Sequence, residues 1–487
     1  MKAKFLQEAD KFCSRSCFPL LFIPAAFLFL LFFSGTTSPL WPNEGYDSAV
    51  FKTMGLALLR GKVLYQDIFD HKGFVLYLIN ALGIGLGLGR WGLFLLQVIG
   101  LSTSLLFLYK TAKLFTSPFK ALLSVSLALV FMSGVFDEGN LTEEWNTYLF
   151  SISLYIIACF FDQGDASTLS AKDAILLGLL LGLSFFIRPN DAVAQIGGAM
   201  VGISLFLYVR KNYHNLIISI SFFLLGFAMV SVPILIYFAS KGALNDMFYG
   251  LLFYNHEYSG SLITMAISTL HHQKLTLLLF LFTLCYLLFC SEKRAILWCI
   301  IPMCILQLLL LGTRFFPHYY IILAPLVNLF ACTIFSQKKE VKILATAILL
   351  LTPFENERQL FNSCINNITY HKITLERKQY LADEFEKSSL LYSTVPEAYK
   401  DSIWNYNIGL ETLIHSGIVQ CNKITVASNQ RLLQEDNIAL RRPAFVVADP
   451  GDNNQNVSDF LTDNYTLFAN NDTAFFKLVL YKRNDIL

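Results

Sequence analysis

The sequence predicts a polytopic α-helical membrane protein followed by a small C-terminal α/β domain. Of the 487 residues, 55% are hydrophobic and only 15% are charged, and 44 are phenylalanines. Apolar runs recur along the first 353 residues, and many are near the length that a helix needs to cross about 30 Å of hydrocarbon. After Pro353 the composition becomes polar, and no further run of that length follows.

Counting the apolar runs gives about eleven expected membrane spans. They are residues 18–33, 91–109, 121–136, 145–161, 174–187, 192–209, 216–240, 275–290, 295–312, 319–335 and 341–353. The apolar stretch 73–89 is not expected to cross, because one more crossing would move the lysines of the next loop to the opposite side. We expect a juxtamembrane or re-entrant helix there.

Lysine and arginine residues in short loops predict the orientation, because they remain on the cytoplasmic side. With the N-terminus in the cytoplasm, every basic loop falls on that side. These residues are Lys2, Lys4, Lys11, Arg15, Lys110, Lys113, Lys120, Arg210, Lys211, Lys293, Arg294, Lys338, Lys339 and Lys342. The chain is therefore expected in the inner, cytoplasmic membrane, with residues 1–353 as a transmembrane domain whose outer loop 1 spans 37–90.

Residues 354–487 are expected to form a soluble α/β domain outside the cytoplasm, because an odd number of spans precedes them. The stretch "ITLERKQYLADEFEKSS" has helical spacing, whereas "KITVAS", "AFVVADP" and "FFKLVLYKR" have the pattern of short strands. This domain contains neither a glycine-rich phosphate loop nor a nucleophile elbow.

Four polar clusters share the outer face under this topology. One is outer loop 1, with "WPNEGYDSAVF" and "FDHKG", and the others are "FDEGNLTEEWN", "FFIRPND" and "GTRFFPHYY". Polar groups that border hydrocarbon are costly and tend to be functional. Any single polar residue is equally well explained as a solvated loop residue or a helix cap. The convergence of four clusters on one leaflet, however, indicates a functional site.

Two classes of function, a transporter and an enzyme, could explain these clusters. A transporter would place its ionisable residues near mid-membrane, in broken helices of two related halves. Here the spans are nearly free of charge at mid-depth, which favours an enzyme that acts on a lipid-linked substrate at the interface. Lys72 and Arg188 could bind a phosphate while a carboxylate takes a proton from an attacking hydroxyl.

The segments "DSAVFKTMGLALL", "DHKG", "GNLTEEW", "FFIRPN" and "PHYYIILAP" resemble the GT-C superfamily of integral-membrane glycosyltransferases. The resemblance is to the bacterial family-39-like branch, which includes aminoarabinose transferases and protein O-mannosyltransferases, and it covers about residues 18–353. It implies a donor sugar on a polyprenyl phosphate carrier and an acceptor outside the cytoplasmic membrane. The acceptor is expected to be an envelope glycan, a lipid or a protein, and no nucleic acid partner is expected.

The resemblance also implies roles for residues of outer loop 1. Asp47 matches the family's essential acid, with Glu44 and Asp70 as substitutes. Lys72 matches a lysine that contacts the carrier phosphate, although Gly73 and the residue after it stand where prolines are usual. The role of His71 stays open between binding a carboxylate, a phosphate or a metal.

The later segments supply the remaining candidates. Glu143 or Glu144 matches a second acid of the family, and Glu143 is preferred. Arg188, Arg314 and His318 are expected to bind substrate, with Arg188 and His318 as phosphate contacts.

The expected function is inverting transfer of a sugar from a polyprenyl phosphate donor to an envelope acceptor. Asp47 is the expected base, Lys72 and Arg188 hold the phosphate, and Glu143 positions the acceptor or acts as a second carboxylate. Alternatively, Asp47 is an N-cap of the helix that follows it. No cofactor is certain, and a divalent cation stays open. The alternative function is a lipid-carrier flippase, a transporter or a scaffold of an envelope glycan assembly complex.

Overall fold

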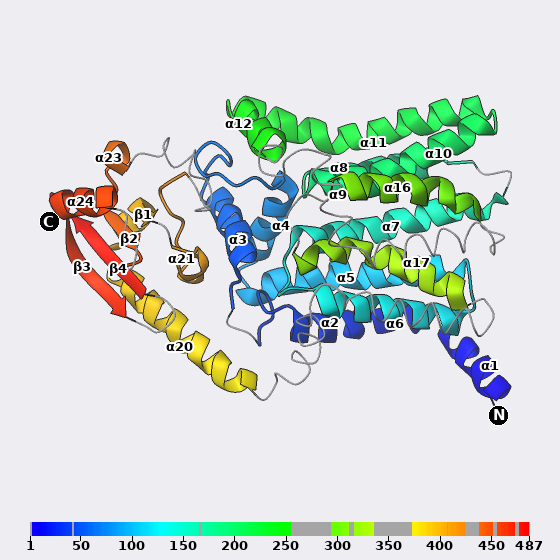
Figure 1. Ribbon diagram of the computed structural model, residues 1–487, viewed down its shortest axis with the longest axis horizontal. Helices are drawn as coiled ribbons and strands as arrows, with labels where there is room; N and C mark the ends of the chain where they lie inside the picture. Colours follow the sequence, from blue (N-terminus) through cyan, green and yellow to red (C-terminus); the bar gives the residue numbers. More distant parts are fainter. Residues whose placement is uncertain are drawn as a thin grey trace.

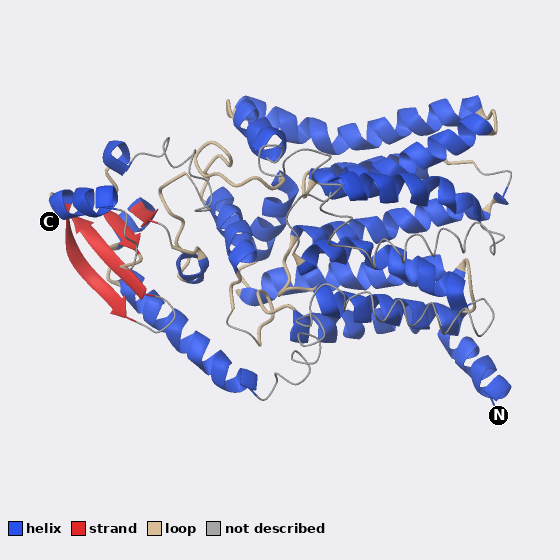
Figure 2. Ribbon diagram, in the orientation of Figure 1, coloured by secondary structure: helices blue, strands red, loops and turns tan. Residues whose placement is uncertain are grey.

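The computed structural model describes most of the chain and is mainly helical (Figures 1 and 2). It describes residues 2–40, 43–164, 168–254, 294–310, 316–335, 373–406, 408–423, 438–450, 455–472 and 477–486. Two expected spans, 275–290 and 341–353, lie outside these residues. The other nine each overlap a described helix.

A bundle of long helices forms the larger part of the molecule (Figure 1). Its helices are α2 (Phe22–Phe33), α5 (Arg90–Lys113), α6 (Pro118–Val135), α7 (Thr142–Asp162), α8 (Ala171–Phe185), α10 (Gly198–Val209), α11 (Tyr213–Ser240), α16 (Leu297–Leu310) and α17 (Ala324–Phe335). Among the described residues, five helices are long and apolar enough to cross a membrane, or six if the bent pair formed by α1 (Lys2–Cys13) with the chain 18–33 is one span. The chain is therefore a membrane protein.

Two short helices of outer loop 1 lie at one end of this bundle. They are α3 (Tyr46–Leu59) and α4 (Phe74–Gly85), and both stand at a steep angle to the bundle helices in Figure 1. Helix α4 has only 12 residues, too few to cross about 30 Å of hydrocarbon. The two helices approach closely at Gly55, where an added Cβ would lie 2.7 Å from the backbone nitrogen of Ala81.

The opposite end of the bundle carries the N-terminal helix and the basic last turn of α5. In Figure 1, α1 lies at that end, far from α3 and α4. The Tyr109 hydroxyl donates to the carbonyl of Cys13 at 2.8 Å, and the Phe119 amide donates to Asp10 Oδ1 at 2.8 Å. These contacts hold α1 beside the end of α5, whose last turn carries Lys110 and Lys113, and beside the start of α6.

The chain is irregular where α8 gives way to α10. Helix α8 ends at Phe185, and Arg188 is extended with φ −150°, as expected for a residue that precedes a proline. A short helix, α9 (Pro189–Ala192), and a π-helical turn, η3 (Val193–Gly197), then lead into α10. π-Helical turns of this kind are frequent at functional sites.

The C-terminal region contains a four-stranded sheet beyond α3 and α4 (Figure 2). Its order is β1-β2-β4-β3, formed by β1 (Ile403–Tyr406), β2 (Phe445–Ala448), β3 (Tyr465–Asp472) and β4 (Lys477–Arg483). β1 and β2 are parallel, and β4 is antiparallel to both of its neighbours. Helices α20 (Ile373–Ser393), α21 (Glu411–His415), α23 (Ile438–Arg441) and α24 (Gln455–Asn464) accompany the sheet.

Outer loop 1 contacts this C-terminal region directly. Arg60 pairs with Asp401 at 3.0 Å, and the Lys62 ammonium donates to the carbonyl of Gln420 at 2.7 Å. The Phe69 amide donates to the carbonyl of Lys423 at 2.6 Å. Segments separated by some 350 residues of sequence therefore meet at the loop.

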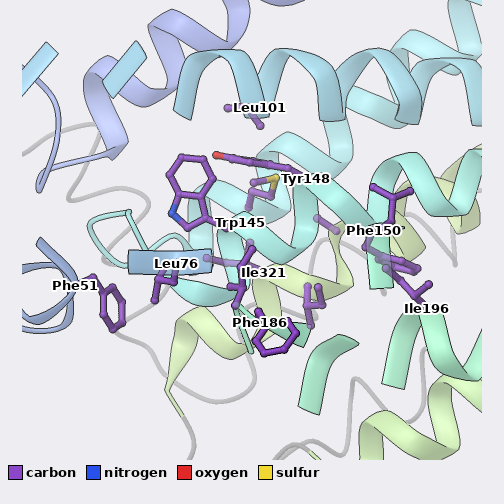
Figure 3. Close-up of a cluster of buried hydrophobic side chains, with 14 of the residues drawn as sticks. Phe51, Leu76, Leu101, Trp145, Tyr148, Phe150, Phe186, Ile196 and Ile321 are labelled. Carbon is purple, nitrogen blue, oxygen red and sulfur yellow. The ribbon is translucent and has the colours of Figure 1, made fainter. Parts of the chain in front are cut away.

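The hydrophobic core continues from the bundle into outer loop 1. Figure 3 shows buried side chains from α3, α4, α5 and α7 in one cluster, together with residues of η3 and of the 3-10 turn η6 (Pro317–Leu323). Phe51, Leu76 and Leu101 are among them, and each is at most 3% exposed. The polar side chains of the outer end therefore rest on closely packed apolar groups that fix the backbone positions.

Candidate functional site

Two buried tyrosines hold the backbone around Lys72. The Tyr77 hydroxyl donates to Asp70 Oδ2 at 2.7 Å and accepts the Lys72 amide at 3.0 Å. The Tyr65 hydroxyl donates to the carbonyl of Lys72 at 2.7 Å. Both rings are fully buried. The lysine therefore projects from a rigid segment between α3 and α4.

The next residue, Gly73, fixes this segment against the end of α8. Its amide donates to the carbonyl of Ile187 at 3.0 Å, and the Val75 amide donates to the carbonyl of Phe186 at 2.8 Å. These two hydrogen bonds place Lys72 next to the chain that leads directly into Arg188.

Lys72 is a half-buried cation surrounded by His71 and acids. Its ammonium contacts His71 Nε2, and His71 Nδ1 lies 3.2 Å from Asp70 Oδ1. Burial lowers the pKa of Lys72 and Arg188 lowers it further, whereas Asp70 and Asp47 raise it. Within the described residues, no carboxylate lies within ion-pair distance of the Lys72 ammonium.

The pKa values of His71 and Asp70, which lie next to Lys72, are shifted as well. Burial, and then the charge of Lys72, lower the pKa of His71. Burial raises the pKa of Asp70, but the hydrogen bond from His71, the charge of Lys72 and the Tyr77 hydrogen bond hold it below the usual range. A neutral His71 that donates from Nδ1 to Asp70 leaves Nε2 to accept from Lys72.

Arg188 forms a second, more deeply buried charge cluster. Its guanidinium is in close contact with Glu143 and lies 3.6 Å from Asp191 Oδ2. It also lies over the Tyr319 ring, 4.3 Å from the centroid. The Thr142 hydroxyl donates to Glu143 Oε2 at 2.8 Å. Three elements, α7, α9 and η6, thus converge on one guanidinium.

Asp47 is the second residue of α3. Gly45, with φ 63°, is the N-cap of that helix and makes no side-chain capping bond, so the N-cap interpretation of Asp47 is wrong. The half-buried carboxylate acts electrostatically on His71 and Lys72. In the part of the chain that the structure describes, it accepts no hydrogen bond and forms no ion pair. It is therefore available to a substrate.

Glu44, by contrast, is fully engaged. Its carboxylate accepts from Lys52 at 2.5 Å and from Arg90 at 2.9 Å, and His415 Nδ1 lies 3.2 Å away. Burial raises the pKa of Glu44, but Lys52, His415 and Arg90 together hold it at about 2. Arg90 also donates to the carbonyl of Asn43 at 2.8 Å. Glu44 therefore fastens outer loop 1 to α5 and to the C-terminal region.

Glu144 points into the bundle, away from Arg188. Its two oxygens accept from the Gln97 amide at 2.8 and 3.0 Å, and it also accepts from the Tyr148 hydroxyl and the Asn140 amide. The side chain is fully buried. Of the two adjacent acids, Glu143 is the one that lies in the cation cluster.

His318 lies beside this cluster. Its Nδ1 is 2.7 Å from Asp137 Oδ2, its ring stacks on Phe316, and it meets Tyr319 edge to face. The structure therefore brings His318 near Arg188 through Tyr319. Arg314 lies outside the described residues.

Sequence reasoning missed three members of the Glu44 cluster. Lys52, Arg90 and His415 carry no motif, and His415 is 371 positions from Glu44. One signal was available, because Lys52 is the one basic residue of α3 and is surrounded in sequence by apolar and small residues, with Asp47 in the first turn as the other charge. Among the described residues, no group of three or more His, Cys, Asp and Glu side chains is arranged to hold a metal ion.

A family model decides the classification of this chain. The model described as "Putative competence-induced protein Ccs4 N-terminal domain" matches residues 26–347. The chain belongs to this Ccs4 N-terminal family. The matched region contains nearly all of the bundle and the charged residues of the site other than His415, while the C-terminal sheet lies beyond it. A search of curated proteins finds no match.

Solved structures show which fold the Ccs4 N-terminal domain has. ArnT from Cupriavidus metallidurans bound to undecaprenyl phosphate aligns with a TM-score of 0.62 at 11% identity, over 95% of this chain and 97% of that chain. Its apo state aligns with a TM-score of 0.58 over the same shares. An oligosaccharyltransferase from Archaeoglobus fulgidus gives 0.47 at 12% identity, over 88% of this chain and 68% of that one. The expected resemblance to GT-C glycosyltransferases is confirmed at the level of the fold.

Proposed function

We propose that this chain is a membrane glycosyltransferase that moves a sugar from a polyprenyl phosphate carrier to an acceptor outside the cytoplasmic membrane. The observation that carries the proposal is the pair Lys72 and Arg188 beside Asp47. Lys72 has no carboxylate of its own among the described residues, and Arg188 is close enough to lower the pKa of Lys72. A lysine without a carboxylate partner beside a second cation favours a phosphate between the two.

The fold supports a lipid-linked donor. The site lies at the end of the bundle where α3 and α4 stand against the ends of α7 and α8, so a carrier phosphate can remain at the membrane interface (Figure 1). ArnT, which has the same fold, was crystallised with undecaprenyl phosphate. For the present chain we propose a polyprenyl phosphate of this kind as the donor carrier.

The proposed orientation places the site outside the cytoplasm. The end that carries α1 also carries Lys110 and Lys113, which the positive-inside rule assigns to the cytoplasm. Helices α3 and α4 and the C-terminal sheet lie at the opposite end. We therefore propose eleven spans in the inner membrane, a transmembrane domain of residues 1–353, and an extracytoplasmic domain of residues 354–487.

The mechanism follows from the charges. Lys72 and Arg188 neutralise the carrier phosphate, which leaves with the electron pair of its bond to the anomeric carbon. The acceptor hydroxyl attacks that carbon from the opposite side, and Asp47 takes its proton. The configuration at the anomeric carbon is therefore inverted. Asp70 and His71 hold Lys72, and Glu143 orients Arg188 and the acceptor.

One transfer assay tests this function. The purified chain in nanodiscs is supplied with radiolabelled hexoses and pentoses on undecaprenyl phosphate, and an envelope fraction serves as acceptor. We expect transfer by the parent and a loss of about a hundredfold or more in Asp47→Asn, because a general base typically contributes at least about that factor. Asp67→Asn, an exposed acid of the same loop that accepts from the Val63 amide, is expected to retain activity.

Two results would overturn the proposal. Undiminished transfer by a correctly folded Asp47→Asn variant would remove the assigned base. No transfer by the parent with any donor of the panel would favour a flippase or a scaffold.

A further inference from the structure

Asn140 makes a three-way contact beneath the first turn of α3. Its side-chain nitrogen donates to Ser48 Oγ and to Asn80 Oδ1, both at 2.9 Å. Its side-chain oxygen accepts from Trp145 Nε1 at 3.1 Å. Asn140 and Asn80 are fully buried, and Ser48 is 1% exposed. One amide therefore links α3, α4 and α7, with both of its hydrogens in use.

The backbone of Asn140 is anchored in the bundle. Its amide donates to Glu144 Oε2 at 2.7 Å, and the Glu144 carboxylate is itself held by Gln97 of α5. The residue adopts φ 57°, a left-handed conformation that asparagine tolerates better than most side chains. The backbone of Asn140 is therefore held in place by the bundle, and its side chain positions α3 and α4.

The first turn of α3 is held by Asn140. Its N-cap, Gly45, offers no side chain to the free amides of the helix, and an end without such a bond tends to fray. Ser48 lies in that turn directly after Asp47, and its hydroxyl receives the Asn140 amide. The contact leaves the free backbone amides as they are, but it ties the first turn to the bundle through the Ser48 side chain.

We propose that Asn140 and Ser48 are positioning residues, which hold the first turn of α3 so that the Asp47 carboxylate faces the attacking acceptor hydroxyl. This inference rests on the proposed function and adds to it a second pair of residues on which the rate depends. Neither residue touches the reacting atoms. They affect the transfer rate only by positioning the Asp47 carboxylate. A variant that already lacks this carboxylate should therefore not respond to their removal.

Two variants remove the contact. Ser48→Ala deletes one hydroxyl, and Asn140→Gly deletes the side chain at a φ that glycine adopts freely. The matched control is Ser104→Ala, because Ser104 of α5 is also fully buried and bonds Ser151 of α7 at 2.7 Å, away from the outer helices. This control measures the cost of losing a buried serine hydrogen bond in the bundle.

The assay is the transfer reaction described above, with kcat and donor KM measured separately. We expect Ser48→Ala and Asn140→Gly to lower kcat at least about tenfold, as for a misplaced catalytic group, with donor KM nearly unchanged. Ser104→Ala should retain the parent kcat. In an Asp47→Asn background, Ser48→Ala should cause no further loss, because the carboxylate it positions is already absent.

The outcomes separate the inference from the function on which it rests. If Asp47→Asn abolishes transfer while Ser48→Ala behaves like Ser104→Ala, the positioning role is wrong and the proposed function stands. A loss from Ser48→Ala that multiplies with the loss from Asp47→Asn would also overturn it, because it would indicate general structural damage. If Asp47→Asn itself transfers normally, the assignment of Asp47 as the base and the inference both fail, whereas the proposed function fails only if the parent transfers nothing.

Discussion

Gly73 lies so close to Phe186 that no side chain fits between them. A Cβ added at Gly73 would lie 2.0 Å from the carbonyl oxygen of Phe186. The φ of Gly73 is −80°, which any residue adopts, so only the lack of space requires glycine here. This close approach joins the segment that carries Lys72 to the segment that carries Arg188.

Gly73→Ala is expected to weaken donor binding more than it weakens folding. The added methyl group must push the loop away from Phe186, which separates Lys72 from Arg188. We expect donor KM to rise about tenfold, since shifting a charged hydrogen bond costs roughly 1.5 kcal/mol or more. Steady-state transfer kinetics measure this change. Gly85→Ala, whose Cβ would be 3.5 Å from the nearest atom, is the control in the same helix and should behave like the parent.

Arg188→Gln is expected to destabilise the protein, because it leaves the buried acids Glu143 and Asp191 without their cation. Breaking a buried pair in this way costs about 3–5 kcal/mol. The double variant Arg188→Gln with Glu143→Gln should recover much of the thermal stability in detergent, because the closer uncompensated charge is gone. Its donor binding should remain weak. Recovery of binding together with stability would show that Arg188 does not contact the phosphate.

The Glu44 cluster predicts a pH dependence. The pKa of Glu44 is about 2 in the folded protein against an ordinary 4.5, so its ionised form stabilises the fold. This contribution is complete above about pH 4.5 and is lost as the pH falls toward about 2. It amounts to at most about 3 kcal/mol.

Glu44→Gln tests this dependence. The variant should melt well below the parent at neutral pH, and the difference in Tm should shrink as the pH falls through that window. A difference in Tm that is constant across the window would contradict the assignment. Lys400→Met, which removes an exposed pairing with Glu397 on the C-terminal region, is the control and should show little difference at any pH.

Much of the bundle was predicted from the sequence, because its apolar runs are long and are rarely interrupted by polar residues. Nine of the expected spans overlap described helices, and the short helix α4 lies where a non-crossing segment was expected. The strands β2 and β4 were also expected from their apolar residues. β1 and β3 were missed, because "IWNY" and "YTLFANND" lack a clear alternation of apolar and polar residues.

The partners of the charged residues could not be predicted from the sequence. Glu143 and Glu144 are adjacent, and only the packing of α7 shows which of them meets Arg188 and which meets Gln97. Glu44 and Asp47 are three residues apart, yet one is held by three basic groups and the other is available. Such differences arise from tertiary contacts, because a single sequence does not show which distant cation a carboxylate will meet.

The most direct test of the central claim is the affinity for the carrier itself. The claim is that Lys72 binds the phosphate of a polyprenyl carrier, and equilibrium binding of undecaprenyl phosphate to the full chain in nanodiscs measures this interaction without any acceptor. Lys72→Met removes the charge and keeps most of the side-chain length. Lys62→Met, in the same loop, removes a lysine that donates to the carbonyl of Gln420 and serves as the control.

The account predicts that the Kd of Lys72→Met rises about 10- to 100-fold, which corresponds to a charged hydrogen bond of roughly 1.5–3 kcal/mol. Lys62→Met should retain the parent Kd. An unchanged Kd in Lys72→Met, with the fold intact, would contradict the account.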